Sequence, residues 1–416
     1  MADNKQLILD ALRYEMLSSR DIAKRTGISQ PTVSRVLKTL PVLKLGGGRS
    51  TVFALLTQPE ALPLYQVDEG GKLLLLGSLY RRLDGASVLV YADGYQAYDS
   101  LPFYLYDVLP AGFLGAITLK KIIQIDSSLN TRSDSWSHAQ VVHYLTHYGA
   151  DLTGNLVLGN QMAERVSELN FAQISRIDYS QITAQIKASP QVFGSSIAGE
   201  QPKFTVYNDA HHLIVKYSPL LSEKNPVAQR HRDLLICEHL ALESLREAGI
   251  PAAKSSLFMD DRVYLEIARF DRIGEFGRKG MVSLRALDAE YVGKNSNWVE
   301  IAQSLLSQKI ISQQSFEQVE IAYAFGQLIA NTDMHLGNFS FYMDGINIGE
   351  ATPIYDMLPM AYMPRQGELM NPEWQTPRFI PVSENARNIA QEIAERFWES
   401  VGKQSDISDE FKELVC

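Results

Sequence analysis

The segment Asn331–Ser340 constrains the fold more than any other stretch of this chain. Asp333 and Asn338 stand five residues apart in it, and a second acid, Asp356, follows in Ile354–Met357. A carboxylate can orient and deprotonate a hydroxyl, while an amide oxygen and a second carboxylate can hold Mg²⁺ beside a polyphosphate. Protein kinases space their catalytic base and metal-binding Asn in this way, with a later Asp on magnesium. Because loop carboxylates are more often simply solvated, the rest of the chain has to decide between the two interpretations.

Two further pieces precede this segment in the order that a kinase-like fold requires. Gly194–Lys203 is rich in small residues, and a flexible loop of this kind can turn its N–H groups toward phosphates. A hydrophobic strand, His212–Tyr217, then carries Lys216 near its end. A lysine on such a strand must reach water or an anionic partner, and nucleotide phosphates are a natural partner.

Two more pieces follow the lysine strand. A helix from about Asp233 to Ala248 carries Glu238 and Glu243, either of which could pair with the strand lysine. Tyr264–Arg272 reads as a strand that leaves into a loop, where a hinge between two lobes could contact adenine. Each piece also fits an ordinary turn, strand end or solvated helix face. Together and in this order they favour a kinase-like site.

The charge of the chain is unevenly distributed. Residues 1–50 hold nine Lys/Arg and four Asp/Glu, a charge of +5, which leaves −14 for the remainder of a chain whose total is −9. A basic end on an acidic body is typical of a module that meets a polyanion. This distribution favours nucleic acid as the partner of the first 50 residues.

The same end has the pattern of a helix-turn-helix. Residues 6–16 predict a first helix, and Ser18 or Ser19 can cap a second one that ends at Gly27. A third helix buries a stripe of Val33, Val36, Leu37 and Leu40 and leaves outward the candidate DNA-binding residues Gln30, Thr32, Ser34, Arg35 and Lys38. Residues 43–53 then predict a hairpin with Arg49 near its tip, as in the wing of a winged helix. The alternative is a small bundle that only dimerises.

Nothing in the sequence indicates export or insertion. No apolar run approaches the ~20 residues needed to span a bilayer, and the N-terminus lacks the layout of a signal peptide. The two cysteines, Cys237 and Cys416, are too few for a disulfide framework. We therefore expect a cytoplasmic protein with no membrane partner, which would be associated with the nucleoid when bound to DNA.

Several of these stretches resemble the HipA family, the serine/threonine kinase toxins of bacterial toxin–antitoxin modules. The matching stretches are Ser196–Lys203, Leu213–Lys216, Ala268–Arg272, Asn331–Ser340 and Tyr355–Leu358, with Leu101–Gly112 resembling the segment that closes the family's small N-terminal subdomain. The resemblance covers roughly residues 65–416 and is strongest for members with a fused helix-turn-helix. It implies an α+β fold, a two-lobed kinase-like body behind an N-terminal winged helix-turn-helix. The expected domains are residues 1–57, 58–150 and 151–416.

The resemblance also implies roles for individual residues. Asp333 would be the catalytic base, and Asn338 and Asp356 would hold Mg²⁺. ATP would be bound by Ser196, Ala198, Gly199, Lys216, Ala268, Phe270 and His335. Ser196 falls where the family has an autophosphorylated serine, whose modification would eject the phosphate loop and silence the enzyme.

The chain departs from the family at three places near the site. The usual Asn-Glu pair after the lysine strand is Cys237-Glu238, the usual acidic hinge residue is Ala268, and an expected histidine-and-acid segment is Met281–Arg285. These departures are compatible with an ATP site, but they argue against carrying the family's protein substrate over to this chain.

The leading functional hypothesis is a toxin-like, ATP-dependent protein serine/threonine kinase that binds double-stranded DNA through residues 1–57. The resemblance suggests an aminoacyl-tRNA synthetase as the protein substrate and a HipB-like antitoxin as a partner. One alternative is a transcription regulator whose kinase-like body only senses nucleotide. Another is a DNA-directed toxin, a nuclease that uses metal held by Asp333 and Asp356.

Overall fold

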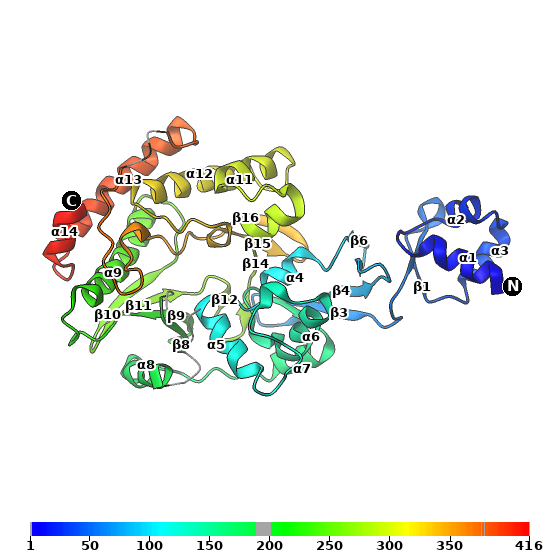
Figure 1. Cartoon of the computed structure of the whole chain (residues 1–416), viewed down its shortest axis with the longest axis horizontal. Coiled ribbons are helices and arrows are strands. Elements are labelled where there is room, and N and C mark those ends of the chain that lie inside the picture. Colours follow the sequence, from blue (N-terminus) through cyan, green and yellow to red (C-terminus); the bar gives the residue numbers. More distant parts are fainter. Residues whose placement is uncertain (1, 189–200, 376, 378, 416) are drawn as a thin grey trace.

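The structure is a computed structural model that describes residues 2–188, 201–375, 377 and 379–415. A small N-terminal module lies at one end of an elongated molecule, and a larger body follows it (Figure 1). Among the described residues, no helix is both long and apolar enough to cross a membrane.

The N-terminal module contains the three helices and the hairpin that the sequence predicted. Its elements are α1 (Ala2–Leu12), α2 (Ser19–Thr26), α3 (Gln30–Leu37), β1 (Val42–Leu45), η1 (Gly48–Ser50) and β2 (Val52–Leu55). Ser18 caps α2 by accepting a hydrogen bond from the N–H of Asp21, and Gly27, at φ 70°, ends the helix. A compact apolar core holds the helices together; it contains Ile8, Leu12, Ile22, Val33, Leu37 and Leu40.

The first helix ends at Leu12, so its predicted extension to residue 16 is wrong. Leu17 instead exchanges two main-chain hydrogen bonds with Phe53 of β2, at 3.2 and 2.9 Å. These bonds require an extended chain, which competes with another helical turn. Met16 then packs against the hairpin rather than along the helix.

A five-stranded antiparallel sheet forms the middle of the molecule, in the order β6-β5-β4-β3-β7. The strands are β3 (Leu62–Val67), β4 (Leu73–Arg81), β5 (Ser87–Tyr91), β6 (Gly94–Tyr98) and β7 (Leu156–Leu158). Because β7 pairs with β3, this sheet extends past residue 150, where the sequence placed the domain boundary. The accompanying helices are α4 (Phe103–Asp107), α5 (Gly112–Ile122), η2 (Ser133–Ser135), α6 (His138–Tyr148), η3 (Gly149–Asp151) and α7 (Asn160–Ser167).

The aromatic segment Leu101–Gly112 contains the short helix α4. Phe103, Tyr104 and Leu105 are buried in the main core, which explains why so apolar a stretch becomes ordered. The helix ends at Asp107, whose carboxylate reaches the second half of the body, as described below.

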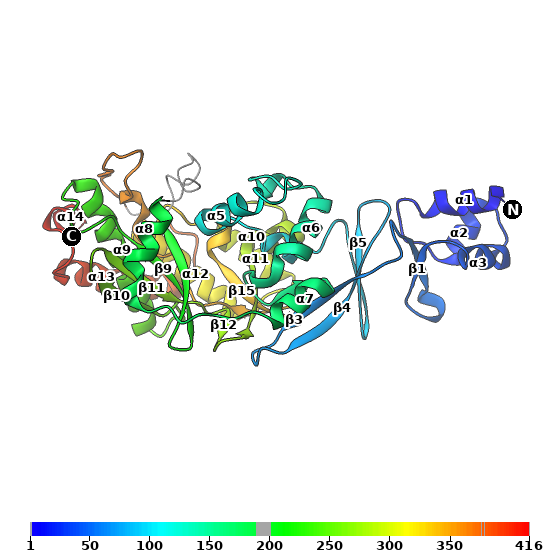
Figure 2. The ribbon, with the colours of Figure 1, turned by 90° about the horizontal axis from the view of Figure 1, so that it is seen from below.

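The N-terminal module is attached to the middle sheet through its own hairpin. Leu45 and Ala54 pack on Val88 of β5, with Val90 and Tyr95 around them. Main-chain hydrogen bonds continue the contact: the N–H of Thr57 donates to Arg81, and that of Leu83 donates to Leu55. Figure 1 places β6, and Figure 2 places β5, at the end of the body that faces the module.

A four-stranded antiparallel sheet, in the order β10-β11-β9-β8, carries the first half of the predicted site. The elements here are η4 (Arg176–Asp178), α8 (Tyr179–Ala188), β8 (Lys203–Asn208), β9 (His211–Tyr217), α9 (Pro226–Glu247), β10 (Ser255–Met259) and β11 (Val263–Ala268). Helix α9 begins at Pro226, earlier than the predicted start at residue 233, because Asn225 caps it by accepting a hydrogen bond from Ala228.

The second half of the body combines helices with a three-stranded sheet, β14-β15-β16. Its elements are β12 (Arg272–Ile273), β13 (Gly277–Arg278), β14 (Gly280–Ser283), α10 (Leu284–Leu287), η5 (Asp288–Val292), α11 (Trp298–Ser307), α12 (Gln313–Leu328), η6 (Leu336–Asn338), β15 (Ser340–Asp344), β16 (Asn347–Ala351), η7 (Met360–Tyr362), α13 (Glu384–Lys403) and α14 (Asp409–Val415). One hydrophobic core runs from the middle sheet through α9 and α12 to α14, so these parts pack as one body.

Candidate active site

A buried group of three charges lies at the centre of the predicted site. The Nζ of Lys216, on β9, lies 2.6 Å from Oε1 of Glu238, on α9, and also donates a hydrogen bond to Oδ1 of Asp356. The side chains of Lys216 and Glu238 are 7% and 1% exposed, whereas that of Asp356 is 34% exposed. Of the two helix acids that the sequence offered, Glu238 is the partner, because Glu243 lies outward and pairs with Arg246.

Main-chain contacts hold Asp356 beside the lysine. Asp356 has φ 53°, a conformation that costs free energy for a residue other than glycine. Ile354, two residues before Asp356, forms a β-bridge with Ala252. Its main chain also exchanges hydrogen bonds with the segment that follows α9. The side-chain amide of Asn331 also donates to the carbonyl oxygen of Asp356 at 3.5 Å. The strained residue Asp356 therefore links the segment Asn331–Ser340 to the part of the body that carries Lys216.

The three charges respond differently to burial. Burial would lower the pKa of Lys216, but the carboxylates of Asp356 and Glu238 raise it above its usual value. Burial would raise the pKa of Asp356, but Lys216 and Lys203 lower it to about 2. For Glu238 burial outweighs the attraction of Lys216, and the pKa of this carboxyl is raised. Asp356 is therefore the carboxylate most disposed to stay ionised and to face a cation.

The segment Asn331–Ser340 is fixed through its main chain. Oδ1 of Asn331 accepts a hydrogen bond from the N–H of Asp333 at 3.0 Å, and the amide of Asn338 donates to the carbonyl oxygen of Asp333 at 2.9 Å. The indole N–H of Trp298 donates to the carbonyl oxygen of His335 at 3.0 Å. Because these bonds hold the backbone, the exposed carboxylate of Asp333 is left available to a substrate hydroxyl.

His335 is held in one orientation at the surface of the site. Its Nδ1 accepts a hydrogen bond from the N–H of Gly337 at 3.0 Å and lies 3.4 Å from Nη2 of Arg285. A neutral imidazole whose Nδ1 accepts carries its proton on Nε2. The exposed Nε2–H can therefore donate to an anion in front of the loop.

Arg285 belongs to the segment that departs from the family, and the sequence did not mark it as a site residue. It lies on α10, whose N-cap is Ser283. Asp107 accepts hydrogen bonds from the N–H and the hydroxyl of Ser283, at 2.6 and 2.5 Å. Burial raises the pKa of Asp107 in spite of these bonds. The middle of the chain thus contacts the helix that places Arg285 beside His335.

The predicted hinge residues lie at the end of β11. Ala268 pairs with Leu213 of β9, and its N–H donates to the carbonyl oxygen of Lys254 at 2.8 Å. The ring of Phe270 is half-buried, with its centroid 5.7 Å from that of Tyr355, the residue that precedes Asp356. Phe270 therefore packs against the residue next to Asp356 of the buried ion group.

Three predicted residues, Ser196, Ala198 and Gly199, lie outside the described residues. Lys203, at the start of β8, lies beside the ion group and is paired with Lys216 across the strands. The side-chain amide of Gln201 donates to the carbonyl oxygen of Tyr217 at 2.7 Å. Lys203 is a second cation near Asp356 that the sequence did not single out, although it ends the predicted phosphate loop.

The predicted DNA-binding residues lie on α3, at its C-cap and in η1 of the hairpin. Arg35 of α3 and Lys38, the C-cap residue of that helix, are exposed, and Arg49 is exposed in η1 at the tip of the hairpin. Gln30 and Ser34 are also exposed, while Thr32 is half-buried and its hydroxyl lies 3.0 Å from that of Ser29. A recess of about 710 Å³ separates α2 from the hairpin; its charged residues are Arg20, Asp21, Lys24 and Arg49.

Comparison with known proteins identifies the fold of the body first, and then the family of the chain. The family model for the HipA-like C-terminal domain matches residues 195–408, and the model for the middle domain of YjjJ-like toxins matches residues 58–167. A chain in the solved complex of the Shewanella oneidensis MR-1 toxin–antitoxin system HipA, HipB and its operator DNA superposes with a TM-score of 0.53. That match has 15% sequence identity and covers 85% of this chain and 93% of the other. The body therefore has a kinase-like, HipA-type fold.

Proteins of similar sequence define the family of this chain more closely than the fold does. Toxin YjjJ of Escherichia coli K12 is 34% identical over 430 residues, which cover 98% of this chain and 95% of that protein. A protein described as a putative kinase in Haemophilus influenzae is 25% identical over 50% of this chain and 64% of its own length. The chain belongs to the HipA family, as a toxin of the YjjJ type.

Proposed function

We propose that this chain is an ATP-dependent protein serine/threonine kinase of the toxin type that carries its own DNA-binding module. The observation that carries the proposal is the buried contact of Lys216 with Glu238 and Asp356, next to the loop that holds Asp333 and Asn338. A strand lysine paired with a helix glutamate, beside a metal-binding carboxylate, is the arrangement on which kinases rely to position nucleotide phosphates.

The residues present fit magnesium and a nucleotide. Asp356 and Asn338 offer the carboxylate and amide oxygens that Mg²⁺ prefers. The neighbouring ammonium of Lys216 keeps the carboxylate of Asp356 ionised, as a metal ligand must be. Lys216 would bind phosphate, and Ala268 and Phe270 would line the adenine pocket. The bound MgATP would supply the phosphoryl group.

The chain's own groups then act on the protein substrate. Asp333, exposed and held through its backbone, would orient a serine or threonine hydroxyl and accept its proton. His335, with its proton on Nε2, would donate toward phosphate oxygens. Ser196, outside the described residues, would be the site of autophosphorylation that silences the enzyme.

The N-terminal module would bind double-stranded DNA as a winged helix-turn-helix. Its α3 would enter the major groove with Gln30, Thr32, Ser34, Arg35 and Lys38, and Arg49 would contact the backbone from the hairpin. The Shewanella complex, which contains HipB and operator DNA, supports a HipB-like antitoxin and DNA as partners. We place the protein in the cytoplasm, associated with the nucleoid when it is bound to DNA.

The test of the kinase is phosphoryl transfer. Wild type should transfer ³²P from γ-labelled ATP to itself and to proteins of a cell extract, and Asp333→Asn should lose at least ~10³ in rate, about 4 kcal/mol of transition-state stabilisation. Asp93→Asn is the matched control, because Asp93 is exposed in the turn between β5 and β6. Equal transfer by wild type and Asp333→Asn would refute the proposed role.

Two other outcomes would replace the proposal. Saturable MgATP binding without any transfer would favour a regulator that senses nucleotide. Nicking of a plasmid with Mg²⁺, lost in Asp333→Asn while no transfer is seen, would favour the nuclease.

A further inference from the structure

Arg285 is an exposed cation at the edge of the candidate active site, and no carboxylate of the described chain forms an ion pair with it. Its Nη2 lies 3.4 Å from Nδ1 of His335, and that nitrogen already accepts a hydrogen bond from the N–H of Gly337. Arg272, by contrast, is bonded to Asp271 at 2.7 Å. The guanidinium of Arg285 therefore has N–H donors available to an anion from outside.

The absence of a side chain on Gly337 makes room for this guanidinium. A Cβ at position 337 would lie 2.4 Å from Nη2 and 3.1 Å from Cζ of Arg285, so any side chain there would displace the arginine. The carbonyl oxygen of Gly337 accepts a hydrogen bond from the hydroxyl of Tyr355 at 2.9 Å, and Tyr355 precedes the proposed metal ligand Asp356. Arg285 thus lies against the loop at a point that is tied to the centre of the site.

The imidazole of His335 separates Arg285 from the proposed nucleotide position. Nδ1 and Nε2 point to different sides of the ring, and Arg285 lies at Nδ1. With Nε2 toward the phosphates, as proposed above, Arg285 lies on the far side of the ring from the nucleotide. The same loop carries Asp333, the proposed base, two residues before His335. Because an extended peptide advances about 3.3 Å per residue, a side chain a few positions from the acceptor hydroxyl can reach Arg285.

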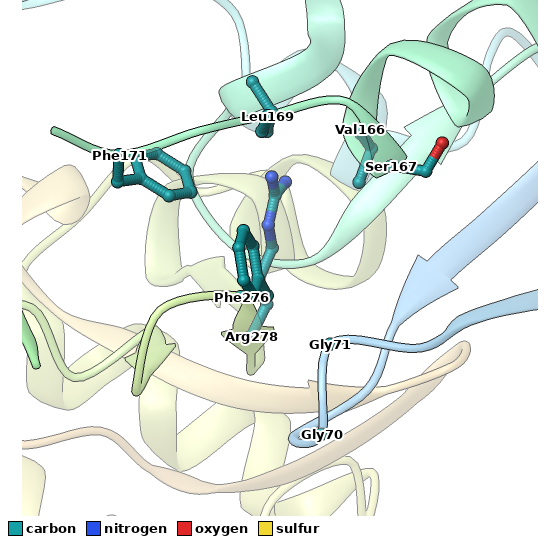
Figure 3. Close-up of a pocket in the computed structure, with 8 residues that line it drawn as sticks. All are labelled: Gly70, Gly71, Val166, Ser167, Leu169, Phe171, Phe276 and Arg278. Atoms are coloured by element: carbon teal, nitrogen blue, oxygen red, sulfur yellow. The ribbon is translucent and has the colours of Figure 1, made fainter.

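Arg278 shows how a structural arginine of this body differs. Figure 3 shows Arg278 beside Phe171 and Phe276, in the wall of a cavity of about 290 Å³. This residue is only 3% exposed, its Nη1 is buried, and its Nη2 donates to the carbonyl oxygen of Ala150. Its guanidinium is directed into the fold, whereas that of Arg285 is offered at the surface.

We propose that Arg285 binds an acidic side chain close to the acceptor serine or threonine, so that this kinase prefers acidic phosphoacceptor sequences. The inference rests on the proposed kinase function and names the class of its substrate. Residues 51–416 carry a charge of −14, but exposed charges more than about 8–10 Å away are largely screened at physiological salt. The neighbouring guanidinium therefore favours an acidic side chain at its own position and disfavours a basic one.

The experiment uses the full chain and a set of serine peptides in a neutral background. Each of about four positions on either side of the serine is fixed in turn as Asp, Asn or Lys. Transfer of ³²P from γ-labelled ATP gives kcat and KM, and fluorescence anisotropy of the labelled peptides gives binding without catalysis. Wild type should prefer Asp to Asn by about fivefold at one or two positions, mainly through KM, as expected for an exposed ion pair.

Three variants test the contact by the ratio of Asp to Asn peptides, which a general loss of activity does not change. Arg285→Gln should abolish the preference, and Arg285→Glu should reverse it in favour of Lys at the same position. Gly337→Ala should weaken it, because the added Cβ displaces the guanidinium. Arg396→Glu is the matched control, since it makes the same change of charge on α13, where the side chain is 52% exposed.

Thermal unfolding curves check that the variants are folded, and if Arg285→Glu does not fold, Arg285→Gln and Gly337→Ala still decide. No preference for Asp in wild type, or the same preference in Arg285→Gln, would overturn the proposal. A fall in kcat that is equal for Asp and Asn peptides would assign Arg285 to the phosphates of ATP and overturn it as well. If the chain phosphorylates no acceptor, the kinase function fails, and the anisotropy of Asp and Asn peptides still decides the role of Arg285.

Discussion

Replacing Lys216 by methionine should destabilise the body, because it removes the cation between two carboxylates. Methionine keeps the length of the side chain on β9, so the change is mainly in charge. Glu238, 1% exposed, would be left without its 2.6 Å partner, whereas Asp356, 34% exposed, could turn toward water. The loss is therefore dominated by Glu238.

The magnitude follows from the burial. Breaking a buried ion pair by removing one partner costs about 3–5 kcal/mol, since an uncompensated charge remains. We expect the lower end, about 3 kcal/mol, because only one of the two carboxylates is fully buried. Adding Glu238→Gln to Lys216→Met should recover about 1–2 kcal/mol, because the neutral amide removes the unpaired charge.

The loss should also depend on pH. The pKa of Glu238 is raised by burial even with Lys216 present, and removing the lysine raises it further. A carboxyl whose pKa is raised in the folded state penalises folding above that pKa, and protonation relieves the penalty as the pH falls through it. The deficit of Lys216→Met should therefore be larger at about pH 8 than at about pH 5.

Urea unfolding followed by tryptophan fluorescence measures the difference. Lys224→Met is the matched control, because Lys224 is exposed just before α9 and its replacement should stay within ~0.5 kcal/mol of wild type. A loss below about 1 kcal/mol for Lys216→Met, or a loss independent of pH, would refute the argument that a buried charge is left unpaired.

Three further predictions address function, and one addresses the contact between the middle of the chain and the site. Ser196→Ala should abolish autophosphorylation and prevent self-silencing, as read by mass spectrometry and by the time course of transfer. Asn338→Ala should weaken MgATP binding in calorimetry, because it removes the proposed metal ligand and a hydrogen bond to the carbonyl oxygen of Asp333. Arg35→Ala with Arg49→Ala should lower the salt slope of DNA binding by about two in gel shifts. Asp107→Ala should reduce phosphoryl transfer by freeing Ser283 and α10.

Each of these has a control and a contrary result. Phosphate found only on residues other than Ser196 would refute Ser196 as the autophosphorylation site. Ser195→Ala is the control variant for Ser196→Ala. If Asn338→Ala left the affinity for MgATP unchanged, Asn338 would only stabilise the loop and would not bind the metal. If the DNA-binding curves of the double variant matched those of wild type, or if Arg396→Ala on α13 altered them equally, the N-terminal module would serve packing rather than DNA binding. If Asp107→Ala left the rate of phosphoryl transfer unchanged, the contact of Asp107 with Ser283 would have only a structural role.

Local patterns predicted much of this molecule. Ser18 and Gly27 delimit α2 as their capping chemistry requires, and the order of strand lysine and helix acid led to Lys216 and Glu238. The sequence could not choose between Glu238 and Glu243, because the two differ only in which face of α9 turns inward. Packing of α9 on the sheet decides that.

Contacts between distant segments escaped the sequence. The carboxylate of Asp107 accepts hydrogen bonds from Ser283, the N-cap of α10, which lies 176 residues later, and no local signal marks such a pair. Arg285 lies beside His335, which is 50 residues later in the sequence. The sequence marked the segment of Arg285 only as a departure from the family's pattern. Lys203 lies beside Lys216 because a hairpin folds them together, which needs a strand register rather than a motif.

The hairpin attachment of the N-terminal module has a consequence for geometry on DNA. A module on a flexible linker would let the body sample a sphere of roughly 5–6 Å × √n around the duplex. Here the strands that carry Arg49 are themselves packed on Val88, and Thr57 is hydrogen-bonded to Arg81. With α3 in the groove as proposed, the body takes one angular position around the helix axis. Two bound copies would then share a face of the DNA when their sites are separated by whole turns of about 10.5 base pairs, and would lie on opposite faces at half turns.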